Sequence, residues 1–427
     1  MPDIPRFTAG PLKGISRLFG QRNSPSTADG HAVRDTRAED EIDTLARRII
    51  LPSQIVTDEE MVRSMHQDRG QKLARQDLWD ELSQKIKFAD ATRLPTPGGE
   101  AASLLMAFGA RSDLVAAAED ALYDGFAPDA EGLVALEDVL NDHPEDYPTS
   151  LVVALAHVDI AWSWRNVAGR SDPIRAAEQS SEHIERAAKI LAPFDGTALN
   201  APSLIAARCA LFAACEKRGA RVSEEYEKLI DLDPATPRHM RALGRHILPD
   251  YAGGLQSLEI SARRIAAITQ DNWGAGAYAW VYLDALALKR RSLELLDAEF
   301  FIEGLQDIVS RKQDQHIVNL LTAFCAIAMA PQGEEALLTK QARKNREDIH
   351  ACLDWLLKNH LRELHPLIWS QTLLSPGLGP MLPSRRALVA KGRQTALRII
   401  AAQLSSMLKD GSTITFSPRG IERQRLI

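Results

Sequence analysis

Aromatic residues are scarce in this chain of 427 residues, at 6% of the composition. Alanine and leucine dominate the apolar residues instead, and long runs of β-branched residues are missing. Strands favour β-branched and aromatic side chains, whereas alanine and leucine favour helices. The composition therefore predicts an all-α protein.

Cysteine is also rare, and no two of the four cysteines form a C-x-x-C pair. They are Cys209, Cys215, Cys325 and Cys352. Structural zinc sites and disulfide frameworks need closely spaced or paired cysteines. We therefore expect no metal, no cofactor and no disulfide framework, and a reducing cytoplasmic setting.

Long apolar runs are absent as well. The longest uncharged stretch, residues 315–333, includes the polar residues Gln315, Asn319 and Thr322, whereas a membrane-spanning helix needs about 20 predominantly apolar residues. We expect a buried helix there and no membrane span. The N-terminal residues also lack the uninterrupted apolar core of a secretory signal.

Three local catalytic motifs are missing from the sequence: the phosphate-binding glycine loop, the H-E-x-x-H zinc helix and the G-x-S-x-G nucleophile turn. Each of them has a fixed local spacing that can be read directly. Their absence favours a protein that is not an enzyme.

Helical periodicity runs along most of the chain, interrupted by polar or Pro/Gly-rich segments. We expect a disordered N-terminal tail at 1–40, a helical lead-in at 41–98, a helical-repeat domain at 99–375, and a linker with a basic C-terminal helix and tail at 376–427. Within these, a long helix is expected over 57–88 with a candidate break at Gly70, and separate helices over 101–108 and 113–123.

Charge is distributed unevenly, although the net charge is only -6. Residues 384–427 contain nine Lys or Arg and two Asp or Glu, so they carry +7 and leave -13 for the rest of the chain. We expect the basic helix, 385–408, to dock against the acidic rest of the chain through an apolar face. This face consists of Leu388, Val389, Leu397, Ile400, Ala401, Leu404 and Leu408. Residues 412–416 alternate like a strand, but no partner strand is evident, so a flexible tail is predicted.

Residues 236–289 form the most distinctive segment. Thr236 followed by Pro237 predicts a helix start, and a second helix is expected after a short loop, from about Gly254. The third helix, 274–288, is apolar nearly all round, with Asp284 as its only charged residue. A helix of this kind is covered by neighbours on most sides, so we place it at the centre of the fold.

The helices repeat at a fixed distance: Pro202 to Pro237 is 35 residues, and so is Pro237 to Asn272. A period of this length is typical of stacked helix hairpins. The period and the proline-closed second helix resemble a tetratricopeptide-type repeat and the bacterial helical-repeat families of unknown function. In the best match, residues 203–234, Ala210, Tyr226 and Pro234 occupy the small, aromatic and closing-proline positions, and Leu243-Gly244 repeats the motif's Leu-Gly pair in the next unit. Ala206, Cys209 and Ala213 depart from the motif.

The resemblance implies a superhelical array of antiparallel helix hairpins, a tetratricopeptide-like solenoid. It also implies a concave surface that binds protein or peptide, and it supplies no catalytic residue.

Five aromatic residues gather within about thirty positions, at Tyr251, Trp273, Tyr278, Trp280 and Tyr282. Aromatic side chains with polar tips suit a binding groove, and they suit a core equally well.

Asp284 lies among these aromatic residues and must be paired or hydrogen-bonded, because it interrupts an apolar helix. Tyr278, Tyr282, Trp280 or Arg245 could donate to it. A contact with a ligand is the alternative.

Scattered histidines and acids provide the alternative of an enzyme or small-ligand-binding protein with a pocket between helices. His157 and Asp159 precede Trp162 and Trp164 in an otherwise apolar helix, so they form either a polar pocket or a locally bonded core with one tryptophan buried.

His239 and His246 are seven residues apart on one helical face, as two metal ligands can be, but no third ligand has matching spacing. With Asp284 and the pair at 157 and 159, they are the candidate residues for such a pocket.

The sequence thus favours a cytoplasmic, non-enzymatic scaffold or adaptor whose partner is an unidentified protein or peptide. The expected binding residues are Tyr251, Trp273, Tyr278, Trp280, Tyr282 and Asp284. Nucleic-acid binding through the basic C-terminal helix is disfavoured, because the rest of the chain is acidic. The sequence gives no indication of the oligomeric state.

Overall fold

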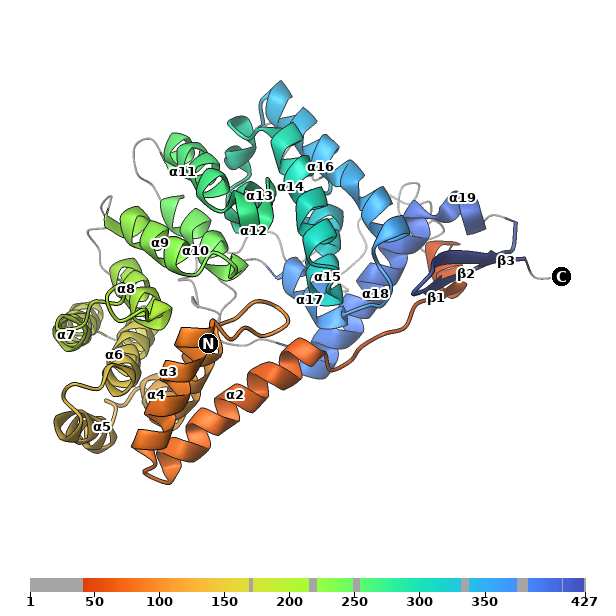
Figure 1. Ribbon diagram of the computed structural model, residues 1–427. Helices are drawn as coiled ribbons and strands as arrows, with labels where there is room; N and C mark the ends of the chain where they lie inside the picture. The colour runs from red at the N-terminus through yellow and green to blue at the C-terminus, as the bar shows by residue number, and fades with distance from the viewer. Residues whose placement is uncertain are drawn as a thin grey trace. The chain divides into compact units, whose positions relative to one another are not determined.

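The computed structural model describes residues 41–168, 172–214, 221–248, 254–331, 338–374, 383–408 and 410–425. These residues are mostly helical, as the composition predicted (Figure 1). The predicted tail at 1–40, Cys215 and Tyr251 lie outside the described residues. Contacts divide the described chain into two compact units, one of Asp58–Ala285 and one of residues 41–57 with those from Leu286 onward. Each unit is described by itself.

The regular secondary structure of the first unit is helical within the described residues, apart from an isolated β-bridge between Pro95 and Ala101. Its helices are α2 (Asp58–Arg75), α3 (Trp79–Thr92), α4 (Ala102–Tyr123), α5 (Glu131–Asp142), α6 (Tyr147–Val167), α7 (Pro173–Leu191), α8 (Pro202–Ala214), α9 (Arg221–Leu232), α10 (Pro237–Ile247), α11 (Gly254–Ile268), α12 (Gln270–Trp273) and α13 (Gly276–Leu288). The boundary between the two units falls near the end of α13.

The predicted break at Gly70 is wrong. Gly70 lies inside α2, where a Cβ atom would stand 2.0 Å from the backbone oxygen of Met106 on α4, so the glycine permits close helix packing. The chain turns after α2 instead, at Asp77, which adopts a positive φ of 55°. Residues 57–88 therefore form parts of two helices.

The predicted separation of 101–108 from 113–123 is also wrong, because α4 runs through both segments. Gly109 and Arg111 lie between the two predicted segments, and each has a role within the helix. A Cβ at Gly109 would stand 1.8 Å from the backbone oxygen of Gln67 on α2, and Arg111 is buried beside Asp159. At these two positions a close helix contact and a buried ion pair stand where the sequence pattern of a buried helix would have an apolar side chain.

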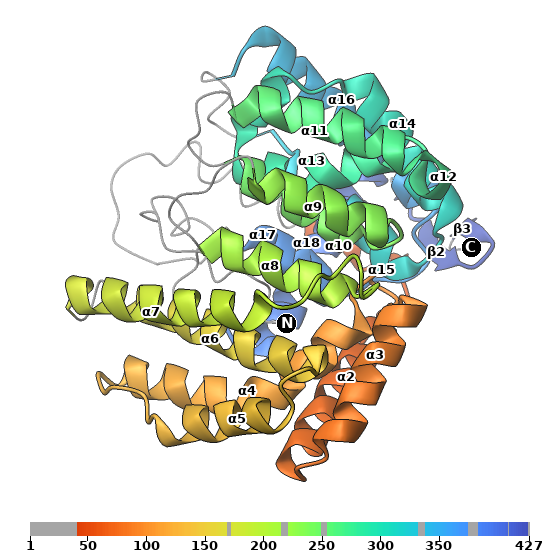
Figure 2. The same cartoon turned by 60° about the vertical axis from the view of Figure 1, so that its left-hand side comes forward.

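Successive helices from α6 to α11 pack against one another in chain order, and Figure 2 shows them side by side. A buried cluster joins α3, α4, α6 and α8 and includes Ile86, Leu104, Leu151 and Leu204. Pro202 and Pro237, 35 residues apart, are the first residues of α8 and α10. The predicted start of α10 is therefore confirmed, although the Thr236 side chain bonds Asp233 instead of capping the helix.

The second unit combines helices with a small sheet. Its elements are β1 (Ile49–Ile50), η2 (Arg290–Glu294), α14 (Ala298–Arg311), α15 (Gln315–Ala323), the π-helical segment η3 (Phe324–Ala328), α16 (Lys340–Asn359), α17 (Pro366–Leu373), α18 (Arg385–Gln403), α19 (Ser405–Leu408), β2 (Thr413–Ser417) and β3 (Gly420–Gln424). Residues 41–46 are also helical.

The basic C-terminal helix docks within this unit, as predicted. α18 packs against α17, and a Cβ at Gly392 would stand 1.8 Å from the backbone oxygen of Pro366. Ile400, Leu404 and Leu408 are buried. Arg398 forms a bidentate ion pair with Asp43, at 2.5 and 2.6 Å.

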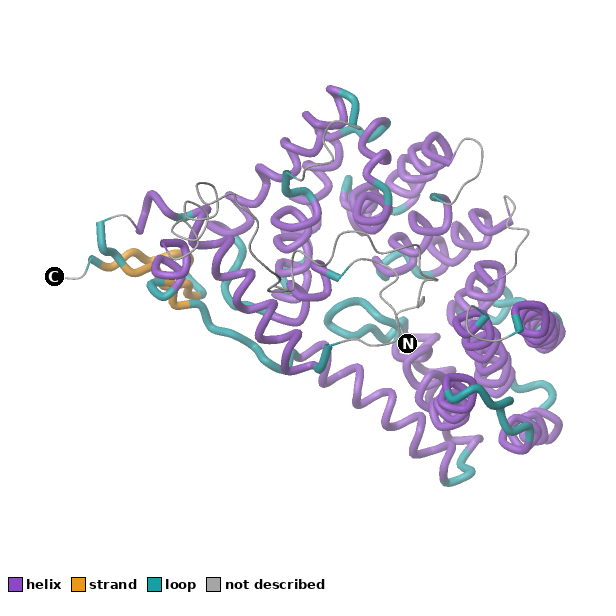
Figure 3. The backbone as a smooth tube through the Cα atoms, turned by 180° about the vertical axis from the view of Figure 1, so that it is seen from behind, coloured by secondary structure: helices purple, strands orange, loops and turns teal. Residues whose placement is uncertain are grey.

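The prediction of a flexible tail after α19 is wrong. β2 pairs with β3 in antiparallel register and with β1 in parallel register, which gives the order β1-β2-β3 (Figure 3). Ile414 and Phe416 are buried on one face of β2. The missing partner strands are a hairpin that turns at 418–419 and a two-residue strand more than 350 positions earlier in the chain.

Within the described part of the chain, none of the helices combines the length and the apolar composition that a bilayer crossing requires. Cys209, Cys325 and Cys352 are buried free thiols. Burial raises the pKa of each of these thiols above its ordinary value, so they are poor nucleophiles.

Candidate functional site

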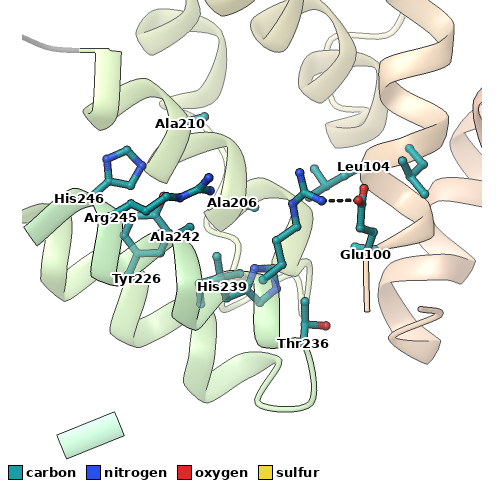
Figure 4. Close-up of a pocket in the computed structure, with 14 residues that line it drawn as sticks. Glu100, Leu104, Ala206, Ala210, Tyr226, Thr236, His239, Ala242, Arg245 and His246 are labelled. Atoms are coloured by element: carbon teal, nitrogen blue, oxygen red, sulfur yellow. Dashed lines mark ion pairs between the residues drawn. The ribbon is translucent and has the colours of Figure 1, made fainter. Parts of the chain in front are cut away.

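A small cavity of about 50 Å³ opens in the first unit where α8, α9 and α10 meet the start of α4 (Figure 4). Alanine side chains at positions 101, 206, 210 and 242 contribute to its walls and leave the space open. The polar residues of its lining are Glu100, Tyr226, Thr236, Arg238, His239, Arg245 and His246. The cavity is therefore apolar in part, with polar and charged groups around it.

Helix α10 brings three arginines to this region. Arg238, Arg241 and Arg245 are spaced i, i+3 and i+7, which places them along one face of the helix. Met240, Leu243 and Ile247 on the opposite face are buried. Burial of the apolar face thus orients the arginine face.

Glu100 holds the first of these arginines. It forms ion pairs with Arg238 and, at 3.3 Å, with Arg63 from α2. Its side chain is only 10% exposed, so two cations stabilise one largely buried carboxylate.

Asp284 on α13 holds the other two. Nη2 of Arg241 lies 2.8 Å from its Oδ1, and Nε of Arg245 lies 3.5 Å from its Oδ2. Burial alone raises the pKa of Asp284, but Arg241 and Arg245 outweigh burial and hold that pKa below its ordinary value. Of the predicted partners, Arg245 is confirmed, whereas Arg241 was not predicted.

Arg245 has a buried nitrogen that makes no hydrogen bond within the described part of the chain. Its Nε is buried and has no hydrogen-bond partner among the described residues. Burial lowers the pKa of its guanidinium, and the positive charges of Arg241 and Arg238 lower it further, against the opposing effect of Asp284. Figure 4 shows the side chain extending toward the wall formed by Ala206.

The aromatic residues expected to contact a partner are buried instead. Trp273, Tyr278, Trp280 and Tyr282 are each at most 1% exposed. The hydroxyls of Tyr278 and Tyr282 both donate to Oε2 of Glu259, at 2.7 and 2.8 Å, and not to Asp284. The interpretation of these four as groove residues is corrected: they form a core, because α13 is covered on most sides.

His157 and Asp159 lie elsewhere, on α6, and neither lines the cavity. Asp159 accepts from Nε of the buried Arg111 at 2.7 Å. Trp164 is buried and Trp162 half-buried, as the locally bonded alternative predicted. These two residues are thus not part of one pocket with His239, His246 and Asp284.

His157 belongs to a cluster with His183 and Glu137. Its Nε2 lies 3.1 Å from Oε1 of Glu137, and its Nδ1 lies 2.9 Å from Nδ1 of His183. Burial lowers the pKa of His157, and burial together with His157 lowers the pKa of His183 to about 4. Both rings are therefore neutral near pH 7, with His183 donating to His157 and His157 donating to Glu137.

The two remaining candidate histidines do line the cavity. His239 lies 3.0 Å from Oδ2 of Asp233, and His246 stacks on Tyr226 with ring centroids 5.4 Å apart. Among the described residues, no group of three or more His, Cys, Asp or Glu side chains is arranged to hold a metal ion. Both histidines have structural contacts instead.

Sequence reasoning missed the residues that give the cavity its charge: Glu100, Arg238, Arg241 and Arg63. A signal was available in α10, where three arginines recur at i, i+3 and i+7. The pairing of Arg245 with Asp284 was among the expected contacts. The partner of Arg238 could not be predicted, because Glu100 is distant from it in sequence.

Comparisons with protein-family models, curated proteins and solved structures give no match to this chain. The tetratricopeptide-like resemblance therefore remains a prediction that rests on the residues named above. Function is inferred here from the geometry of the cavity and its charges.

Proposed function

We propose that the chain is a non-enzymatic scaffold or adaptor that binds a protein or peptide, with the cavity bounded by α8, α9 and α10 receiving one side chain of the partner. The observation that carries the proposal is the composition of the cavity wall. Small residues such as Ala206, Ala210 and Ala242 leave a recess, and Arg238 and Arg245 lie beside it. A recess of this kind is suited to anchor a single side chain within a larger interface.

The pairing of the charged groups supports binding over catalysis. Glu100 binds arginines, and His239 binds Asp233. A general base must lie within reach of a nucleophile or a substrate proton, whereas Glu100 is engaged by arginines and Asp233 by His239. Burial raises the pKa of Tyr226 well above its ordinary value, which disfavours a reactive phenolate.

The proposal includes the finer architecture predicted from the repeats. We infer that the helices of the first unit form a superhelical array of antiparallel hairpins, similar to tetratricopeptide repeats. The contacts of α6 to α11 in chain order support this arrangement, as does the spacing of 35 residues between the first residues of α8 and α10. A cytoplasmic location is proposed with it, and the buried free thiols fit a reducing compartment.

Filling the recess tests the proposal. Ala242 is half-buried and lines the cavity, whereas Ala267 on α11 is exposed and does not line it. Ala242→Leu should weaken capture of the partner from a host lysate by the tagged full chain, and Ala267→Leu should leave capture unchanged. Proteins recovered equally by both variants would not be ligands of this recess.

The alternative of an enzyme or a small-ligand-binding protein makes a different prediction. It expects an ordered small molecule to copurify with the chain and to be lost in Ala242→Leu, with no protein captured in a manner that depends on position 242. Native mass spectrometry of the two variants distinguishes these outcomes.

A further inference from the structure

The lining of the cavity bounded by α8, α9 and α10 is half polar and half apolar. The apolar half consists only of alanine and leucine, at Ala101, Leu104, Leu105, Ala206, Ala210, Leu229 and Ala242. The kind of group that the cavity takes up therefore depends on whether the polar residues are available to a ligand.

The polar residues at the start of α10 are bonded to other groups of the protein. Glu100 forms an ion pair with Arg238. His239 lies 3.0 Å from Oδ2 of Asp233, and the side chain of Thr236 bonds the same aspartate. A charged ligand group would have to displace these contacts or remain without a partner of its own.

The polar residues at the end of α10 are engaged as well. Nε of Arg245 lies 3.5 Å from Oδ2 of Asp284, so α13 supplies the charge that balances this arginine. The ring of His246 stacks on Tyr226, with centroids 5.4 Å apart and an angle of 21° between the planes. A strongly polar ligand would thus lose its hydration in the cavity without gaining comparable hydrogen bonds.

The alanine and leucine walls favour an apolar ligand instead. Leu105 and Leu229 are each 1% exposed, so these walls are part of the packed interior. Water beside such walls has few hydrogen-bond partners, and an apolar group that displaces it gains the free energy of apolar burial. The cavity is therefore matched to an apolar group.

The volume of the cavity limits the size of this group. At about 10 to 15 Å³ for each water-sized position, a volume of about 50 Å³ holds roughly three or four such positions. An aliphatic cavity that takes up benzene has a volume of about 150 Å³. An aromatic ring therefore does not fit here unless the walls move.

We propose that the cavity takes up an aliphatic side chain of about three or four carbon atoms, as in valine, leucine or isoleucine, and that Ala206, Ala210 and Ala242 set this size limit. The inference deepens the proposed function and rests on it for the carrier of the side chain, which is the bound protein or peptide. The aliphatic site itself can be probed without that carrier.

The first test uses methyl NMR of the full chain with labelled alanine, titrated with isobutane, benzene or inorganic phosphate. Isobutane has four carbon atoms and should shift the methyl signals of Ala206, Ala210 and Ala242. The signal of the exposed Ala267 is the control and should not move. Benzene and phosphate should leave all four signals unchanged, because one is too large and the other is charged.

The second test fills the cavity covalently. Ala242→Leu adds an isopropyl group at a half-buried lining position, so it should melt no lower than the unmodified chain and should abolish the isobutane shifts at Ala206 and Ala210. Ala242→Phe exceeds the size limit and should lower the melting temperature by about 5 °C or more. Ala267→Leu and Ala267→Phe are the matched controls and should melt alike.

These two tests can overturn the aliphatic site directly. Phosphate or benzene that shifts the three cavity signals while isobutane does not would contradict it. Equal melting temperatures of Ala242→Leu and Ala242→Phe would contradict the size limit.

The carrier is tested by selecting a random peptide library on the full chain and discarding peptides that Ala242→Leu still binds. The inference predicts valine, leucine or isoleucine at one fixed position of the remaining peptides, and replacing that residue by alanine should weaken binding about tenfold. A charged or aromatic residue at that position would leave the proposed function standing and overturn the inference. Isobutane binding with no peptide that depends on position 242 supports the aliphatic site and contradicts the proposed function.

Discussion

Gly244 on α10 lies directly against the backbone carbonyl oxygen of Val281 on α13, so close that a Cβ at position 244 would stand 1.9 Å from that oxygen. The two helices therefore approach at the minimum distance that their backbones allow. This approach brings Arg241 and Arg245, on either side of Gly244 in sequence, within reach of Asp284. The charge arrangement of the cavity thus depends on one glycine.

Gly244→Ala should destabilise the protein by about 1 to 3 kcal/mol, because the added methyl group forces α10 away from α13. Alanine favours helices over glycine by about 1 kcal/mol, so a net loss measures the steric conflict. Urea unfolding gives the comparison with Gly132→Ala, at an exposed position on α5 where the nearest atom is the flexible Leu114 side chain. Equal stability of the two variants would contradict the close approach.

Trp280→Ala should lower the free energy of unfolding by about 3 to 5 kcal/mol. Trp280 is 1% exposed and packs edge to face on Trp273, with ring centroids 5.8 Å apart. Phe88→Ala is the control, since Phe88 is 63% exposed, and should change stability by less than about 0.5 kcal/mol. A Trp280 variant as stable as the unmodified chain would place this residue outside the core.

Much of the helical content and the burial of α13 could be predicted, because both follow from local patterns. Residues 274–288 are apolar on nearly every side of the helix, which indicated burial, and Thr236-Pro237 marked the start of α10. The same patterns could not distinguish a core from a groove for Trp280 and Tyr282. That distinction depends on which helices pack over α13, and this packing is part of the tertiary structure, which local sequence patterns do not determine.

Other features escaped prediction because they join distant residues. β2 pairs with a strand at Ile49, far earlier in the chain. The alternating pattern at 412–416 therefore seemed to have no partner strand. Gly70 was interpreted as a candidate break because glycine disfavours helices, and separate helices were predicted on either side of Gly109, whereas both glycines permit contact between α2 and α4. The pair of Arg245 with Asp284 was expected, but the pair of Arg238 with Glu100 was missed, because these two residues come from separate segments.

The protein should lose stability as the pH falls from about 6.5 to about 4. The folded state holds the pKa of His183 at about 4, below its ordinary value of 6.5, because burial and His157 oppose protonation. Between about pH 6.5 and pH 4 the unfolded chain therefore binds a proton at His183 that the folded chain does not bind. The contribution of neutral His183 to the free energy of unfolding is fully present above this range and is lost as the pH falls through it. The partly exposed position of His183 limits the expected loss to about 2 kcal/mol.

His183→Gln should reduce this pH dependence, because the amide can still donate to His157 but does not titrate. The midpoints of urea unfolding at pH 5 and pH 7 give the measurement. His143→Gln, which replaces a half-exposed histidine near Asp80, is the control. An unchanged slope in the His183 variant would show that other groups, among them His157 and Glu137 in the same cluster, cause the dependence.

Phe416→Ala should destabilise the protein by about 3 to 5 kcal/mol, whereas Thr415→Ala should cost less than about 1 kcal/mol. Phe416 is 2% exposed and faces the interior, and Thr415 is half-buried on the opposite face of β2. Differential scanning fluorimetry of both variants is sufficient. Two neutral substitutions would indicate an unpaired tail, contrary to the sheet β1-β2-β3.

The central proposal is that the cavity bounded by α8, α9 and α10 receives one side chain of a bound protein or peptide. A photocrosslinking amino acid placed at position 242 of the tagged full chain, with the same amino acid at the exposed position 267 as the control, tests it most directly in a host lysate. The account predicts a protein adduct from position 242 and no such adduct from position 267. The same adducts from both positions, or none from position 242, would contradict it.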